Sequence, residues 1–467
     1  MKTVLTRFWS NYGMAGVLLL LCLYYSFATL QEQRPQGATA AKSLAATITV
    51  PAPANILIVA KTTDEDAQFA DELERRLKAA GYEVPRKVLG DPRAARVAID
   101  EITAQGVKLA AIATTPDCAA WAVFDRISVP RLTPPSYKWP TFLKAENLLN
   151  VANQIVVVAV IAVGMTMVII TGGIDLSVGS LIALSAVVTG TLIRSYAGAQ
   201  AAAPAGLVLC CLAGIAMCAL IGAFSGLMVT LFKVPPFIAT LGVMQVASGL
   251  AYIIAKGSSI YEIPDSFVWL GRGVGMFSVP NAVILMVVIY ALAHVVMSRT
   301  TLGRYIYAVG GNIEAARLSG VRVGLILMFV YTVSGAMAGL GGIVTASQLK
   351  SASPTYGLMY ELYVIAAVVV GGTSLAGGEG KILGTLIGAF IIAVIQNGMN
   401  LTGVESYTQK VVLGLVILGA VLLDMMKKRG WKNKFPFLKG RPARRTTEPK
   451  HQAKPTPLQV TKLPSSL

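Results

Sequence analysis

Two long apolar runs with a short polar break between them constrain this chain more than any other feature. Residues 154–171 form an apolar run that can cross or nearly cross a hydrocarbon core about 30 Å thick, and a second run begins at Val178. The break carries a glycine pair and one carboxylate, Asp175. Because exposed backbone and charge are costly in lipid, the break must lie in a cavity, inside the protein or at the membrane interface.

The composition extends this picture to most of the chain. Of the 467 residues, 55% are hydrophobic and 13% are charged, whereas a soluble protein is normally about one-quarter charged. We therefore expect an all-α polytopic membrane bundle with about ten transmembrane helices. The apolar runs are 14–30, 154–171, 178–195, 205–232, 235–255, 281–297, 325–347, 361–371, 382–398 and 411–423.

The first apolar run has the shape of a signal peptide as well as that of a transmembrane helix. A cleavage motif is present at Ala38-Thr39-Ala40, but it lies rather far from the apolar core of the run. An uncleaved first transmembrane helix within residues 1–30 is therefore the favoured interpretation.

The net charge of +17 is concentrated in the tail, residues 427–467, which has many Lys and Arg residues and one acid, Glu448. Nucleic-acid binding is one interpretation, but basic residues directly after a final span are the positive-inside signal. We expect a disordered cytoplasmic tail, no nucleic-acid partner and, from an even number of spans, a cytoplasmic N-terminus. The loop 298–323 then lies in the cytoplasm, and residues 54–132 lie outside it.

Residues 54–132 differ in character from the rest of the chain. They follow a linker of Gln, Ala, Thr and Pro at 31–53, and short β-branched runs alternate in them with amphipathic helical patterns. This alternation predicts an inserted extracytoplasmic α/β lobe with a parallel sheet. The expected strands are 55–60, 82–89, 107–113 and 127–132, and the expected helices are 64–80, 92–105 and 116–125.

The order of motifs in this lobe, from Lys61-Thr62-Thr63-Asp64 to Thr114-Thr115-Pro116-Asp117, resembles the N-terminal half of a periplasmic sugar-binding protein of the ribose type. Such proteins close two lobes around a sugar, and this chain has only one. Ligand binding at the strand ends, near Asp64, Asp91 and Asp117, is therefore less favoured than a docking or regulatory role, or a relic.

The break at 172–177 has two compatible interpretations. It is a tight turn in which Asp175 caps the next helix through the amides of Ser177 and Val178, or it is a broken-helix element that lines a polar pathway. Other polar residues within the apolar runs are few, and neutral amides that hydrogen-bond a sugar fit them better than a proton relay. The candidate pathway residues are Gly172, Gly173, Asp175, Ser177, Gln245, Asn397 and Asn400.

A second glycine-rich segment, residues 371–381, echoes the first break and suggests an internal repeat. Its Gly380-Lys381 pair invites a phosphate-loop interpretation, which fails because Leu375 stands where glycine is needed and Ile382 where Ser or Thr is needed. The chain thus has no ATPase of its own and is not predicted to be an enzyme. Five scattered cysteines and two histidines give no metal-ligand spacing, so no metal or other cofactor is predicted.

The loop 301–320 is either a connector on the membrane surface or a docking peg. Asn312 can cap a short helix that carries Glu314 and Arg317 between flanking glycines. A short rigid helix on the cytoplasmic face suits the docking of a partner.

Several ordered motifs resemble the permease subunits of ribose-type (monosaccharide) ABC importers. They are Gly172–Gly179, the run from Val234 to Gly242, Gly310–Gly320, and Gly371–Gly398 with the following residues to Leu401. The resemblance implies a type II-like permease core, residues 133–426, in a bacterial inner membrane. It also implies a second permease copy, ABC ATPase subunits that use ATP, and an extracytoplasmic sugar-binding protein, besides the surrounding membrane lipid.

By the same resemblance, the short helix in the loop is the element that couples the permease to the ATPase. The coupling residues it implies are Gly310, Gly311, Asn312, Glu314, Ala315, Ala316 and Arg317. Two other functions stay open from the residues alone. One is a membrane sensor or regulatory permease homologue whose outer lobe responds to a ligand, and the other is a secondary carrier.

Overall fold

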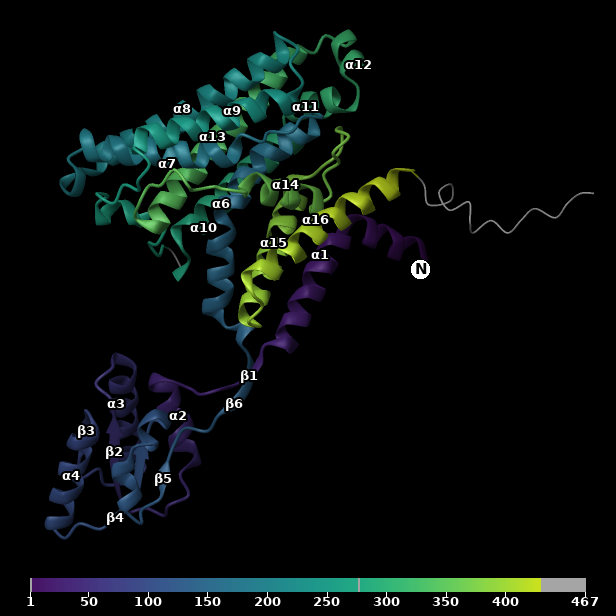
Figure 1. Ribbon diagram of the computed structural model, residues 1–467. Coiled ribbons are helices and arrows are strands. Elements are labelled where there is room, and N and C mark those ends of the chain that lie inside the picture. Colours follow the sequence, from purple (N-terminus) through teal and green to yellow (C-terminus); the bar gives the residue numbers. More distant parts are fainter. Residues whose placement is uncertain (1, 276–277, 430–467) are drawn as a thin grey trace, which may run out of the picture. The chain divides into compact units, whose positions relative to one another are not determined.

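The computed structural model describes residues 2–275 and 278–429, and most of them form helices (Figure 1). Contacts divide the chain into a unit of residues 1–420 and a unit of residues 421–467, and the last helix runs from one into the other. The expected tail, 427–467, lies outside the described residues from position 430 onward.

Seven helices of the described residues are long and apolar enough to cross a membrane. They are α6 (Ala145–Ile170), α7 (Val178–Ser195), α8 (Pro204–Thr230), α9 (Pro236–Ala255), α10 (Asn281–Arg299), α13 (Val323–Leu349) and α15 (Ile382–Leu401). Apolar segments of 10–17 residues lie in three more helices, α1 (Lys2–Ala28), α14 (Tyr360–Val370) and α16 (Ser406–Arg429). These bounds lie close to the expected runs, and the polytopic helical bundle is confirmed.

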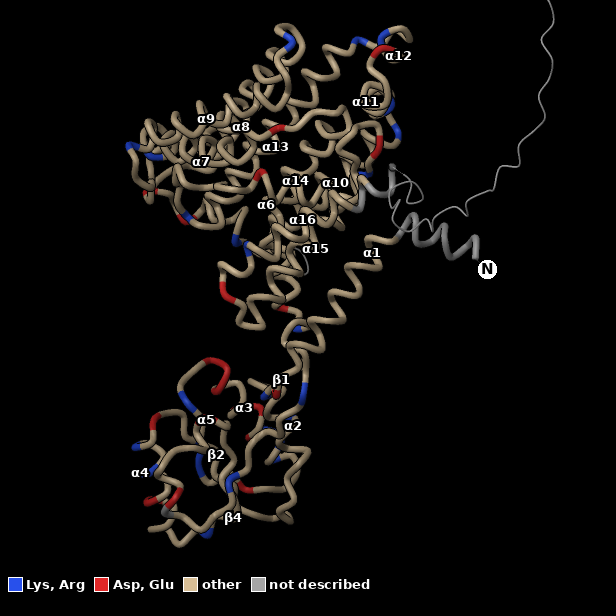
Figure 2. The backbone as a smooth tube through the Cα atoms, turned by 45° about the vertical axis from the view of Figure 1, so that its right-hand side comes forward, with Lys and Arg blue, Asp and Glu red and all other residues tan. Residues whose placement is uncertain are grey.

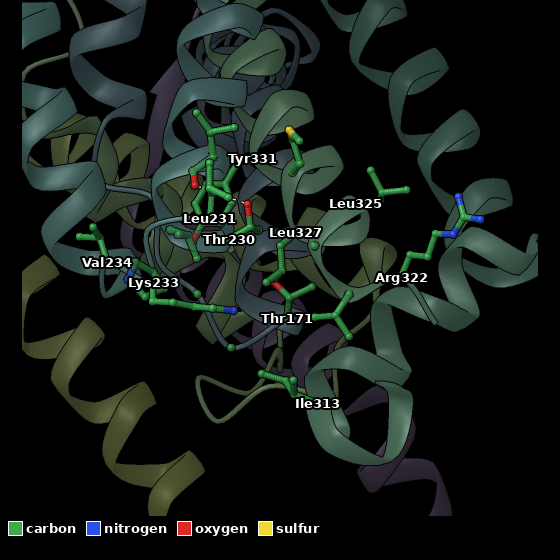
Figure 3. A pocket seen from close by; sticks show the side chains of 18 of the residues that line it. Thr171, Thr230, Leu231, Lys233, Val234, Ile313, Arg322, Leu325, Leu327 and Tyr331 are labelled. Carbon is green, nitrogen blue, oxygen red and sulfur yellow. Dashed lines mark hydrogen bonds between the residues drawn. The ribbon is translucent and has the colours of Figure 1, made fainter. Parts of the chain in front are cut away.

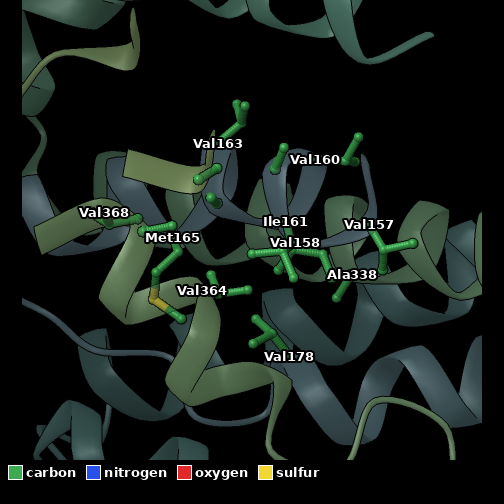
Figure 4. Close-up of a cluster of buried hydrophobic side chains, with 14 of the residues drawn as sticks. Val157, Val158, Val160, Ile161, Val163, Met165, Val178, Ala338, Val364 and Val368 are labelled. Carbon is green, nitrogen blue, oxygen red and sulfur yellow. The ribbon is translucent and has the colours of Figure 1, made fainter. Parts of the chain in front are cut away.

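Helix α6 lies at the centre of the bundle and is buried along most of its length. It packs against α13, α15, α14 and α10, and its valines and isoleucines form the core shown in Figure 4. Close helix contacts depend on glycine: a Cβ at Gly164 would lie 2.6 Å from the Ser334 Cα on α13. Such small-residue contacts let helices associate in lipid, where apolar burial gives little driving force.

Two short helices, α11 (Thr301–Gly311) and α12 (Ile313–Leu318), connect α10 to α13. A non-helical segment, residues 351–359, precedes α14 and consists mostly of turns. Its Ala352 pairs with Ile260 through two backbone hydrogen bonds of 2.8 and 2.9 Å. The first part of this segment, residues 351–354, is buried in protein, as non-helical backbone at membrane depth requires, whereas Leu358 and Met359, directly before α14, are exposed.

The lobe contains a parallel four-stranded sheet in the order β3-β2-β4-β5. Its strands are β2 (Asn55–Ala60), β3 (Lys87–Leu89), β4 (Leu109–Thr114) and β5 (Arg131–Leu132), and its helices are α3 (Asp64–Ala79), α4 (Pro92–Ala104) and α5 (Pro116–Ala119) with the 3-10 turn η1 (Ala122–Arg126). The parallel α/β architecture agrees with the expectation, although β3 and β5 are shorter than predicted.

Figure 2 shows the charged residues gathered on this lobe and at the α11–α12 connection, while the long helices carry few.

Residues 31–53 are not the linker that we expected. Strand β1 (Leu30–Gln33) pairs with β6 (Tyr137–Pro140) in an antiparallel ribbon at the two ends of the insertion, and the turn η2 (Thr141–Leu143) then leads into α6. Helix α2 (Gly37–Thr47) packs against α3 and buries Ala40, Ala41 and Leu44 in the lobe core. The lobe therefore begins at α2, because its sheet needs this helix to cover one face.

The strand ends at which a sugar would bind in a complete two-lobed protein have other partners here. Asp91 caps α4 by accepting hydrogen bonds from the amides of Arg93 and Ala94, at 3.1 and 2.9 Å. Lys61 Nζ lies 3.2 Å from the Asp117 carboxylate, and this hydrogen bond raises the pKa of Lys61. Two of the three carboxylates considered from the sequence are thus engaged within the lobe.

Candidate translocation and coupling sites

The break between α6 and α7 is built around the buried carboxylate of Asp175. One oxygen accepts hydrogen bonds from the Ser177 amide at 3.0 Å and from the Ser177 hydroxyl at 2.6 Å. The other oxygen accepts one from the Ser334 hydroxyl of α13 at 2.7 Å. The side chains of Asp175, Ser177 and Ser334 are fully buried. The carboxylate therefore fixes the turn, as expected from the Ser177 amide, and also joins the break to a helix 159 residues away in sequence.

The two glycines of this break have different roles. Gly172 has φ +83°, a backbone conformation that other residues rarely adopt, and ends α6. Gly173 lies against the hydroxyl of Tyr331, where a Cβ would not fit. The break also contacts α9, since the Thr240 hydroxyl donates to the Ile174 carbonyl at 3.2 Å. Two helices besides α6 and α7 therefore contact the break: α9 and α13, which are distant in sequence and reach it through the fold.

The second glycine-rich segment, residues 371–381, packs directly onto the first. The amide of Gly378 donates to the Ile170 carbonyl at 2.8 Å, which satisfies a backbone acceptor at the end of α6. Gly310 of α11 is pressed against the same carbonyl and against Gly378, so that a Cβ there would overlap with both. The Tyr307 hydroxyl donates to the Gly380 carbonyl at 2.8 Å. Both breaks and helix α11 therefore meet at Ile170.

Helix α12 follows this junction and has the capping expected from the sequence. The Asn312 side chain accepts a hydrogen bond from the Ala315 amide at 2.9 Å, and Arg317 pairs with Glu314 at 3.1 Å. Ala316 is buried against the bundle. The remaining faces are exposed, including Ile313 at 42% and Leu318 at 89%. Gly311 and Ala315 are also exposed. A short capped helix with an apolar, exposed tip is suited to insertion into a partner protein.

Gln245 lines a groove between α7, α9 and the non-helical segment before α14. The groove has a volume of about 190 Å³. Its polar residues are Ser180, Gln245, Ser248, Thr355, Tyr252, Tyr356 and Glu361. Gly179, in the first turn of α7, leaves room for the Glu361 carboxylate, which a Cβ at that position would displace. Discontinuous helices with polar groups at their ends are typical of substrate sites in transporters.

Asn397 and Asn400 line a different cavity, of about 430 Å³, at the ends of α6, α13 and α15. Asn397 and Asn147 exchange two amide hydrogen bonds, of 2.9 and 3.1 Å. The Asn400 oxygen accepts from the Gln409 amide at 2.8 Å. The other polar lining residues are Asn150, Asn153, Gln154, Gln348 and Arg272. The structure thus divides the seven predicted pathway residues among the break, the groove and this amide-rich cavity.

Sequence reasoning did not find the residues that complete these sites. Ser334 and Tyr331 lie in the apolar α13, and Asn147 lies at the start of α6. Ser and Tyr in an apolar helix give no local signal of a partner, because the partner is set by helix packing. Asn147 carried a detectable signal, since Asn147, Asn150 and Asn153 recur at three-residue spacing and so share one helix face.

The family model of the branched-chain amino acid transport system / permease component matches residues 147–421. The chain is 46% identical over 293 residues to the ribose import permease protein RbsC of Escherichia coli (strain K12), which covers 62% of this chain and 88% of that protein. RbsC of Bacillus subtilis (strain 168) is 45% identical over 289 residues, with 62% and 87% covered. The galactose/methyl galactoside import permease protein MglC of Escherichia coli (strain K12) is 38% identical over 300 residues, with 62% and 89% covered.

No solved structure matches the chain. The family match begins at position 147 and so contains the break, the groove, the amide-rich cavity and α12, whereas the lobe at 54–132 precedes it. The relatives are transport permeases and not enzymes, in agreement with the absence of a phosphate loop from the sequence. The chain therefore belongs to this family of transport permease components and is similar to its ribose and galactose import permeases.

Proposed function

We propose that this chain is the membrane subunit of an ABC importer and forms the translocation path for a monosaccharide such as ribose or a related sugar. The observation that carries the proposal is the family match, because it spans the bundle that holds every candidate site. The relatives are import permeases for ribose and galactose, so the alternative of a membrane sensor is not favoured. ATP is used by a separate ATPase subunit, and the chain itself needs no cofactor.

The chemistry of the two polar cavities supports a neutral, hydroxyl-rich substrate. Side-chain amides offer donors and acceptors together, which matches the hydroxyl groups of a sugar. Gln245 in the groove, and Asn397 and Asn400 in the amide-rich cavity, supply such groups. We place the amide-rich cavity at the extracytoplasmic end of the path and the break at 172–177 at the cytoplasmic end, where Lys and Arg accumulate around α11 and α12.

The exposed helix α12 is the element through which the ATPase would act on the path. Gly310 packs against the end of α6, so a displacement of α12 is transmitted to the junction of both breaks. Exchanging the two charges, as E314R/R317E, keeps the ion pair within α12 but reverses the charge at each position that a partner meets. We expect loss of ATPase binding with an unchanged thermal unfolding temperature. An ATPase complex that survives the exchange would contradict this role.

The decisive test is purification of the full chain in a gentle detergent from its host, followed by transport in proteoliposomes. We expect a co-purifying ATPase with phosphate-loop motifs, and ATP-dependent uptake of ribose or galactose when a sugar-binding protein is supplied. A chain that purifies without an ATPase, or uptake that persists without ATP, would overturn the proposal. The second permease copy is expected in the same complex.

We also propose that the lobe faces outward and tunes the docking of the sugar-binding protein. Its boundaries suggest a clean deletion: removal of residues 37–132 keeps the β1–β6 ribbon and leaves a short connection between the two strands. We expect uptake at saturating sugar to persist and uptake at low sugar to change. Identical uptake at both concentrations would show that the lobe has no part in delivery.

A further inference from the structure

A large cavity lies between the end of α8, the start of α13, helix α12 and the first break (Figure 3). Its volume is about 890 Å³. Leu227, Val229, Leu231, Val234, Leu325, Leu327 and Met328 make much of its wall apolar. Its ionisable lining residues are Lys233, Arg317, Arg322 and Tyr331, so the lining described has three cations and no carboxylate. The groove and the amide-rich cavity described above do not share this combination.

Two of these cations have no partner among the described residues. Arg317 pairs with Glu314, whereas no ion pair or side-chain hydrogen bond engages Lys233 or Arg322 within residues 2–275 and 278–429. Lys233 also has φ +57°, which is uncommon for a residue with a side chain. Figure 3 shows its side chain extending across the cavity toward Thr171, with Arg322 at the opposite rim and turned outward.

A polar group deeper in the cavity is also unpartnered. Tyr331 is fully buried, and its hydroxyl has no hydrogen-bond partner in the described part of the chain. That hydroxyl lies against Gly173 and has almost no accessible surface, so a ligand in the cavity does not reach it in this conformation. Cations at the rim and an apolar wall match an amphiphilic molecule with an anionic head.

The position of the cavity along the helices indicates that this molecule is a lipid of the membrane. Helix α8 ends at Thr230, α9 begins at Pro236 and α13 begins at Val323, so the lining includes the ends of three candidate membrane spans. At this level the cavity opens beside exposed apolar side chains, among them Leu231 at 66% and Leu325 at 54%. Basic pockets between transmembrane helices on the cytoplasmic side bind the head groups of anionic lipids.

We propose that this cavity binds an anionic phospholipid of the inner leaflet, with the phosphate at Lys233, the positive charge of Arg322 at the far rim adding to the attraction, and the acyl chains along α8 and α13. The cavity is bounded by Thr171 and Gly172 of the break and by Ile313 of α12. A bound lipid therefore links the α8–α9 connection to the coupling region and sets how readily the two move. Lipid binding rests on the cavity, whereas the choice of the inner leaflet and the effect on transport rest on the proposed orientation and function.

The test is native mass spectrometry of the purified full chain after exchange into detergent with either phosphatidylglycerol or phosphatidylcholine. We expect the wild type to retain phosphatidylglycerol and to lose phosphatidylcholine. The variant K233Q/R322Q should bind phosphatidylglycerol roughly 30-fold more weakly, because two cations near the head group are lost. The matched control is R194Q/K256Q, which removes one exposed Arg and one exposed Lys at the ends of α7 and α9 that lie away from the cavity.

A second variant keeps both charges and fills the cavity instead. Gly324 lines the cavity, and a Cβ there would meet only the Thr230 Cβ, at 3.9 Å, so the G324L side chain begins without a clash. It should also reduce phosphatidylglycerol retention. Equal retention by K233Q/R322Q and the control, or equal retention of both lipids by the wild type, would overturn the proposal. The measurement needs neither sugar nor ATPase, so its failure is distinct from failure of the proposed transport function.

Discussion

The two glycine-rich breaks of the bundle begin alike and are stabilised by different means. Each follows an apolar helix and starts with a glycine in the left-handed region, Gly172 at φ +83° and Gly372 at φ +89°. The first break is fixed by the buried carboxylate of Asp175. The second has no carboxylate in this role: it is fixed by backbone hydrogen bonds, such as that of the Ser374 amide to the Glu379 carbonyl at 3.0 Å, and by its contact with Ile170. The Ser374 hydroxyl also accepts from the Ala376 amide at 3.1 Å.

The first break therefore depends on one side chain, whereas the second depends on close contact between its backbone and that of neighbouring helices. A buried carboxylate is stable only when its acceptors are satisfied, so the first break needs Ser177 and Ser334 together. The second break needs small residues, because its backbone touches that of α6 and α11. The shared pattern therefore reflects a similar local turn, while the demands on the surrounding helices differ.

Replacement of Asp175 by alanine should have the largest effect. D175A leaves the hydroxyls of Ser177 and Ser334 without their acceptor in a buried site, and it removes the three hydrogen bonds that hold the turn. We expect a loss of about 3 kcal/mol in the free energy of unfolding and uptake at background level. Thermal unfolding in detergent and uptake in proteoliposomes measure the two effects.

The matched control for this variant is E379A in the second break. The Glu379 side chain is exposed, and only its backbone carbonyl takes part in the turn. We expect E379A to unfold and transport like the wild type. Equal damage from the two variants would refute the distinction between a carboxylate-dependent and a backbone-dependent break.

The next effect should come from the junction of the two breaks. In G310A the new methyl group overlaps with the Ile170 carbonyl and the Gly378 amide, so α11 must shift away from both breaks. Overpacking of this kind costs about 1–3 kcal/mol, and the shift should reduce ATP-driven uptake about tenfold. The control is G249A on α9, where a Cβ meets nothing within 4 Å and no proposed site is involved, so uptake should stay unchanged.

Much of the bundle could be predicted from the sequence because its long helices coincide with long apolar runs. Helix α9 was expected at 235–255 and spans Pro236–Ala255, with the prolines marking its start. The cap of Asn312 on α12 was also predictable, since it depends on residues three apart. Interactions within one turn are encoded locally, and both breaks were located for the same reason.

The remaining parts depend on tertiary contacts that no local pattern records. The partner of Asp175 on α13 is set by the packing of α6 against that helix. Strand β1 has no alternating pattern and exists because β6 pairs with it. Helix α2 did carry a local signal, its alanines, which favour a helix, but its composition was interpreted as that of a linker. The orientation of the lobe, the pathway roles of the amides and the count of ten spans stay predictions.

The smallest effects should come from the two glycines at which the breaks are alike. Gly172 and Gly372 both have positive φ, and a Cβ at either position meets nothing within 4 Å. Alanine there costs only backbone strain, about 1 kcal/mol for each site. G172A and G372A should therefore lower the unfolding temperature by equal, small amounts and leave uptake within about twofold of the wild type. If G172A reduces uptake much more than G372A does, the backbone of the first break has a role in transport beyond forming the turn. The two breaks would then be alike in sequence but not in function.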